Sequence, residues 1–191
     1  MKIAAVLAVL VCLLPFMSHA APIDLGALTC DKYENEIMNA PAASQHEDAV
    51  DVVMWMFGFA VAKAGAHVMY GDALQQFGNS LDIECKIHPN TNLLDALATV
   101  KLANTNPMDL DTLGCATFEA RHVEMAQSDP QSANTIMMWL LGYSVGKAGG
   151  RILDSSSLSA FAAGLANRCT QHPDSTLYDA VTSVKPPKQK K

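Results

Sequence analysis

This sequence states one pattern twice, and that duplication limits the fold more than any other feature. A cysteine, a tryptophan-centred apolar run, a Lys-Ala-Gly triplet, a second cysteine and a His-Pro pair follow each other in both copies. The landmarks are Cys30, Met54–Phe59, Lys63–Gly65, Cys85 and His88-Pro89, and then Cys115, Met138–Tyr143, Lys147–Gly149, Cys169 and His172-Pro173. The step from copy to copy is constant for every landmark after the opening cysteine, where it is longer by one. Two copies at so long a period predict a duplicated small domain and exclude a solenoid.

The first twenty residues have the pattern of a secretory leader. Lys2 precedes an apolar stretch over residues 3–16, and Ser-His-Ala at 18–20 is a small-x-small cleavage site. The stretch is shorter than the roughly 20 apolar residues that a membrane-spanning helix needs. We therefore expect a signal peptide over 1–20 and a soluble, Sec-exported periplasmic chain with no membrane span.

The expected export to an oxidising compartment indicates how the cysteines are used. Four remain after the leader, and an even number in an oxidising compartment favours disulfides. Three pairings are possible, and the duplication favours the one that each copy can make alone, Cys30 with Cys85 and Cys115 with Cys169. A metal site would call for closely spaced ligand pairs of the C-x-x-C type, which this sequence lacks. We predict disulfides, no metal and no cofactor.

The remaining signals are helical. Apolar residues do not alternate with period two over any useful length, and no Asn-Gly or Asp-Gly hairpin turn occurs. In the first copy we expect helices over 31–38, 44–65, 72–87 and about 90–103, with Ser44 and Glu47 forming a capping box. In the second copy, Asp129 is expected to cap a helix that starts at Pro130, and 154–157 to cap the next.

These signals predict an all-α protein of two tandem four-helix, disulfide-bridged units packed as a pseudo-dimer. The expected segments are the signal peptide at 1–20, a first unit at 21–103, a linker at 104–113, a second unit at 114–184 and a disordered Lys-rich tail at 185–191.

The second helix of each unit carries the functional hint. Asp51 is the only charge between residues 49 and 62, and residues 133–146 have none. A helix that is apolar on all sides must be covered on all sides, either by its counterpart from the other copy or another chain, or by its own unit's core. The residues that we expect to bind clients or to join the copies are Val53, Met54, Trp55, Met56, Phe57, Phe59, Ile136, Met137, Met138, Trp139, Leu140 and Tyr143.

Catalysis finds little support in the residues. Gly142, Ser144 and Gly146 match G-x-S-x-G, but they lie inside an apolar helix, whereas a nucleophile elbow needs a strand-turn-helix. His88 and His172 each precede a proline at a helix end. Such a histidine can cap the helix, bind a metal ion or sense pH. We expect a protein that is not an enzyme.

The chain resembles the HdeA/HdeB family of periplasmic acid-stress chaperones in the order of its motifs. These are Thr29-Cys30-x-x-Tyr33, a Trp-bearing apolar helix that closes with Gly and an aromatic residue, a Lys-Ala-Gly turn, and a second cysteine before His-Pro. The likeness occurs once per copy, over 29–102 and 114–184. It implies a small helical bundle closed by one disulfide. It also implies a dimer that is inactive at neutral pH, loosens in acid and exposes apolar surface to unfolding clients without ATP.

Charge permits this mechanism without selecting it. The chain without its leader has 12 Lys and Arg against 19 Asp and Glu, and full protonation of its carboxylates would bring it to about +17 with five histidines. We expect an ATP-independent holdase whose partners are unfolded proteins, as a pseudo-dimer or a homodimer, with no nucleic-acid partner. The alternative is a periplasmic binding or immunity protein with one dedicated protein partner.

Overall fold

The structure is a computed structural model that describes residues 22–39, 45–69, 74–100 and 108–186, with the backbone alone for 45–48. We call residues 22–100 the first half and 108–186 the second half. The expected signal peptide, the Ser44–Glu47 capping box and the last five residues of the tail lie outside the described side chains.

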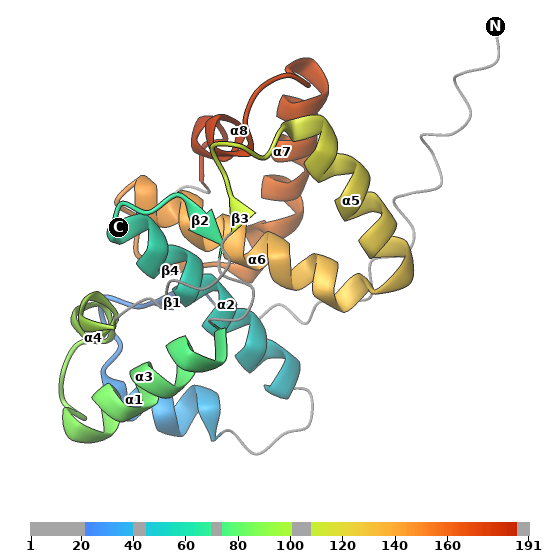
Figure 1. Ribbon diagram of the computed structural model, residues 1–191. Helices are drawn as coiled ribbons and strands as arrows, with labels where there is room; N and C mark the ends of the chain where they lie inside the picture. The colour runs from blue at the N-terminus through green and yellow to red at the C-terminus, as the bar shows by residue number, and fades with distance from the viewer. Residues whose placement is uncertain (1–21, 40–44, 70–73, 101–107, 187–191) are drawn as a thin grey trace, which may run out of the picture.

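Each half is a set of helices around one long central helix (Figure 1). The first half contains α1 (Cys30–Lys32), a π-helical turn η1 (Tyr33–Met38), α2 (Gln45–Lys63), α3 (Leu74–Ile87) and α4 (Leu93–Thr99). The second contains α5 (Cys115–Ser128), α6 (Pro130–Lys147), a 3₁₀ turn η2 (Ser155–Ser157), α7 (Leu158–Gln171) and α8 (Leu177–Ser183). The mainly helical prediction is confirmed.

The helix ends follow the local sequence. The Asp129 carboxylate accepts a hydrogen bond from the Ser132 amide at 3.1 Å, so the predicted cap of α6 is present. The Asp154 carboxylate accepts from the Ser156 amide, but it caps the 3₁₀ turn η2, from which α7 continues. Beyond α2 and α6, Gly65 and Gly149 have φ values of 71° and 73°, which favour glycine and end both helices.

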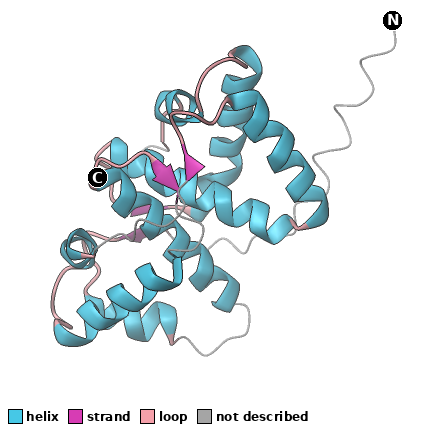
Figure 2. Cartoon of the chain, in the orientation of Figure 1, coloured by secondary structure: helices cyan, strands magenta, loops and turns pink. Residues whose placement is uncertain are grey.

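The all-α prediction did not include the short strands that the structure contains. The described part of the chain has four two-residue strands near the centre of the molecule (Figure 2): β1 (Ile23–Asp24), β2 (Val68–Met69), β3 (Met108–Asp109) and β4 (Ile152–Leu153). Strands this short have no period-two pattern to detect. Their hydrogen bonds come from pairing with distant segments, β1 with β4 and β2 with β3, both antiparallel.

The segment expected to be a linker contains a strand and a buried residue. Residues 108–109 of the span 104–113 form β3, and Leu110, next in the chain, is fully buried. The Leu110 amide donates to the His67 carbonyl oxygen at 2.8 Å, and its own carbonyl accepts from the Tyr178 amide at 3.0 Å. Leu110 therefore joins the two halves.

Both disulfides are present, and each lies within one half. Cys30 bonds Cys85 with 4.8 Å between the Cα atoms, and Cys115 bonds Cys169 with 5.1 Å. The hydrogen bonds around them also recur. The Cys30 amide donates to the Thr91 carbonyl, and the Cys115 amide donates to the carbonyl of Ser175, the counterpart of Thr91 in the second copy. The same local structure thus forms twice.

The core is continuous across the molecule, and α2 and α6 form its centre. Their mutual contact is the most extensive between any two described elements. In Figure 1, α1, α3 and α4 lie on one side of this pair, and α5, α7 and α8 on the other. No described helix combines the length and the apolar character needed to cross a membrane.

Candidate functional site

The contact between α2 and α6 is the candidate site. Each helix is too apolar to have a solvent-facing side: every residue of α6 from Met137 to Gly146 is buried, and so is every residue of α2 from Met54 to Ala62. Such a helix is stable in water only when other elements cover it all round. Here the two helices provide much of that cover for each other.

Glycines bring the two helices into backbone contact. A Cβ atom placed on Gly58 would collide with the Trp139 carbonyl oxygen, and one placed on Gly142 would collide with the Trp55 carbonyl oxygen. One turn further along α6, a Cβ on Gly146 would lie 2.9 Å from the Ala62 methyl group. Small residues four apart allow helix axes to approach closely. The crossing is therefore set by backbone fit.

Aromatic rings flank this crossing in matching pairs. Trp55 stacks on Phe59 and Trp139 stacks on Tyr143, each with 5.3 Å between ring centroids. Phe57 meets Trp139 edge to face across the helix pair at 6.4 Å. Both tryptophans are completely buried. The two copies therefore contribute equivalent rings to one shared core.

The structure brings together the twelve apolar residues expected to bind clients or join the copies. Val53 and Ile136 are half-buried and the others are buried: Met54, Trp55, Met56, Phe57, Phe59, Met137, Met138, Trp139, Leu140 and Tyr143. In this state none of them forms an exposed surface.

Polar contacts between the halves were not predicted. The Tyr143 hydroxyl donates to the Ala66 carbonyl oxygen at 3.0 Å, and the Asn134 amide donates to the Asp51 carboxylate at 3.2 Å. Burial, with Tyr178 and Asp111 nearby, raises the pKa of the Tyr143 phenol, so it remains a donor. Both contacts join residues from different copies, and no local pattern in the sequence could have indicated them.

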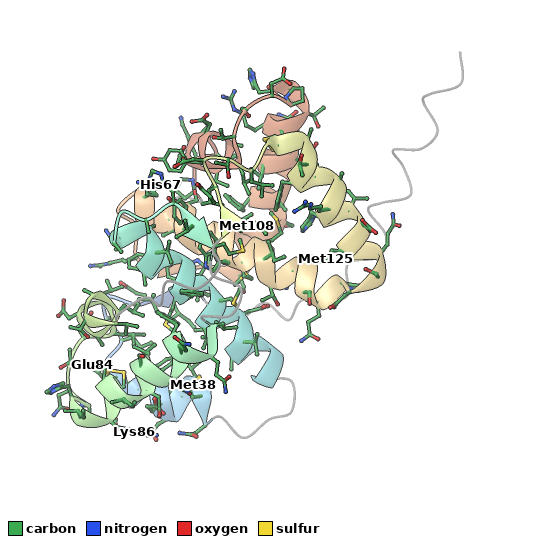
Figure 3. The ribbon with its side chains drawn as sticks, viewed as in Figure 1. Met38, His67, Glu84, Lys86, Met108 and Met125 are labelled. Carbon is green, nitrogen blue, oxygen red and sulfur yellow. A yellow bond between two sulfur atoms is a disulfide. The ribbon has the colours of Figure 1, made fainter. Side chains whose placement is uncertain are left out.

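Among the described residues, an Arg–Asp ion pair and a His–Asp hydrogen bond also join the halves. Arg151 Nε lies 3.1 Å from Asp24 Oδ1, and His67 Nδ1 lies 2.9 Å from Asp111 Oδ2. The His67 ring stacks on Tyr178 with 4.0 Å between centroids. Arg151 follows α6 at the position where His67 follows α2, so the duplication places a basic residue at both ends of the contact. Figure 3 shows His67 near β2, beside the second half.

A second cluster of charges lies away from this contact, on α3 and η1. Lys86 Nζ is 2.7 Å from Asp82 Oδ2, and that hydrogen bond raises the pKa of Lys86. Partial burial and the Asp82 carboxylate raise the pKa of Glu34, while burial raises that of Tyr33. In Figure 3, Glu84 and Lys86 mark this outer end of α3.

The other candidate groups offer no reactive arrangement. Ser144 of the G-x-S-x-G match is buried inside α6, where its hydroxyl donates to the Val184 carbonyl oxygen at 3.4 Å. His88 and His172 are exposed at the ends of α3 and α7, and the amide of each donates to a carbonyl one turn earlier. Within the described ranges, no three His, Cys, Asp or Glu side chains are placed to hold a metal ion.

Comparison with known proteins adds one match. The model of the HdeA/HdeB family matches residues 94–179, from α4 through the Cys115–Cys169 bridge to the first turn of α8. No curated protein and no solved structure matches the chain. The match supports membership of the HdeA/HdeB family.

Proposed function

We propose that this chain is an ATP-independent acid-stress chaperone of the periplasm, a holdase that hides α2 and α6 at neutral pH and exposes them to unfolding clients in acid. The observation that carries the proposal is the α2–α6 contact itself. It is a large, continuous, Met- and aromatic-rich surface, and each helix depends on the other half of the chain for its cover. The family match is in keeping with this function.

We also propose that the halves are tandem HdeA-like units arranged as a pseudo-dimer within one chain. Reciprocal strand pairing supports this: the strand before the first helix of each half pairs with the strand after the central helix of the other half. The Gly58–Trp139 and Gly142–Trp55 contacts are reciprocal in the same way. This arrangement would let one chain do alone what a dimer does in single-unit relatives.

The contacts between the halves suit release by acid. Asp24, Asp51 and Asp111 each supply a carboxylate to an inter-half contact. Carboxylates as a class are neutral in strong acid, where a contact that depends on their charge is lost. The chain as a whole has 19 Asp and Glu against 13 Lys and Arg, and it becomes strongly positive when the carboxylates are neutral. Repulsion between the halves then adds to the loss of these contacts.

The disulfides limit what acid can open. Each bridge closes a loop within one half, so the halves can separate while each stays compact. The surfaces uncovered would be those of α2 and α6, including Met54, Met56, Met137 and Met138. Methionine side chains are flexible and suit contact with many client shapes.

Light scattering of an acid-labile client tests the proposal. The oxidised protein is added to the client at pH 2–4 and at pH 7, from substoichiometric to equimolar amounts. We expect suppression of aggregation in acid only. A lack of protection in acid at every dose would refute the holdase function, and so would equal protection at pH 7, where α2 and α6 are covered.

A further inference from the structure

The two buried tryptophans each have an indole N–H group with no acceptor among the described residues. Both Trp55 and Trp139 are 0% exposed. Most buried donors in proteins are satisfied, so two unsatisfied donors at equivalent positions are unusual. They occupy the same place in the two copies, one in each central helix.

Both indoles belong to the helix faces that meet. Trp55, Gly58 and Ala62 are spaced three and four residues apart, so they share one side of α2. Gly58 and Ala62 on that side contact α6 directly. The ring of Trp139 meets Phe57 of α2. Separation of α2 and α6 would therefore bring both indoles to water.

Two hydroxyl groups of α6 do have hydrogen-bond acceptors. The Tyr143 hydroxyl donates to the Ala66 carbonyl oxygen, and the buried Ser144 hydroxyl donates to the Val184 carbonyl oxygen. Polar side chains of α6 can thus find acceptors in this core. The indole N–H groups are the exception, although phenylalanine or leucine would fill a core without bringing a donor.

We propose that the N–H groups of Trp55 and Trp139 bias the contact toward opening. In the closed state each loses its hydrogen bond to water and gains none from the residues that the structure describes, and separation of α2 from α6 restores it. They lower the free energy needed to part the helices without reducing the apolar surface that is then exposed. The use of that opening for client binding rests on the proposed function, but the bias itself does not.

An isosteric replacement tests this directly. Each tryptophan is replaced, singly and together, by 3-benzothienyl-alanine, in which sulfur takes the place of the indole N–H and the ring shape is kept. The control is tryptophan inserted by the same suppression system. Hydrogen exchange of the α2 and α6 amides is followed by mass spectrometry at pH 7 on the oxidised chain. Each replacement should slow exchange by about 5- to 150-fold, the fold-change expected for an unsatisfied buried donor, and the double replacement should slow it further.

Several results would overturn the proposal. Exchange that is unchanged or faster in both single replacements would do so, as would loss of helical circular dichroism, because the analogue keeps the packing shape. A crystal structure with an ordered water bonded to each Nε1 would also overturn it. Absence of client protection by the parent protein, with exchange still slowed by the analogue, would instead refute the proposed function and leave this inference standing.

Discussion

Gly142 lies against the carbonyl oxygen of Trp55 with no room between them for a Cβ atom. The reverse relation holds in the first copy, where Gly58 lies against the carbonyl oxygen of Trp139. The close packing of α2 on α6 therefore depends on glycine at both positions, because every other residue type has a Cβ atom there.

Gly58→Ala and Gly142→Ala should each force α2 and α6 apart. The added methyl group meets backbone, which cannot rotate away, so we expect a loss of about 1–3 kcal/mol in the free energy of unfolding. Urea denaturation at pH 7 measures it. Gly78→Ala on α3 is the matched control, since nothing lies within 4 Å of its Cβ position. It should stabilise by up to about 1 kcal/mol because alanine favours helix. Equal effects at Gly58 and Gly78 would contradict the close contact.

Asp24→Asn and Asp111→Asn should raise the pH at which the halves separate. Each removes a carboxylate charge from a contact between the halves while keeping the side-chain shape. Because both contacts are partly exposed, we expect each substitution to lower the free energy of unfolding by about 0.2–1 kcal/mol at pH 7. Binding of an apolar-surface dye during acid titration gives the midpoint. Asp174→Asn, in the exposed turn before α8, makes the same charge change and should leave the midpoint in place. A shift of the same size for Asp174→Asn would show that net charge alone decides.

Loss of either disulfide should destabilise mainly its own half. The Cys30–Cys85 and Cys115–Cys169 bridges span 55 and 54 residues, for which chain entropy gives about 4 kcal/mol each. Serine pairs at 30 and 85, or at 115 and 169, separate the two effects. Hydrogen exchange by mass spectrometry should show faster exchange in α3 and α4 for the first pair and in α7 and α8 for the second. Uniform acceleration in both halves would mean that neither half holds together alone.

Glu34→Gln should make the first half more stable at neutral pH. Burial and the Asp82 carboxylate raise the pKa of Glu34 above its ordinary value. The folded state then binds the Glu34 proton more tightly than the unfolded state, so stability rises as pH falls through that raised pKa. Glutamine removes this dependence, and we expect a gain below about 1 kcal/mol because the group is partly exposed and screened by solvent. Urea midpoints at pH 7 and in mild acid measure it.

The second half offers the control for that substitution. Glu119 follows Cys115 at the same distance as Glu34 follows Cys30, and Ala166 occupies the position that corresponds to Asp82. Glu119→Gln should therefore change the urea midpoint less than Glu34→Gln at both pH values. The opposite order would show that the Glu34–Asp82 repulsion is not the cause.

The helices could be predicted because their determinants are local. The cap at Asp129, the proline at 130 and the glycines at 65 and 149 act within one or two turns, and the structure has helix ends at each. The π-helical turn at Tyr33–Met38 was missed because only its geometry, and no residue type, distinguishes it from an α-helix.

The sequence by itself indicated the two disulfides, the order of the main helices and the two central apolar helices. Each follows from spacing and composition within one copy. Only the tertiary structure decided what covers those two helices and which polar atoms form hydrogen bonds or ion pairs between the halves. The β1–β4 and β2–β3 pairings, the His67–Asp111 pair and the burial of Leu110 all join segments that are distant in the sequence. Contacts of this kind depend on how two surfaces fit, and the fit at Gly58 and Gly142 becomes visible only when both helices are in place.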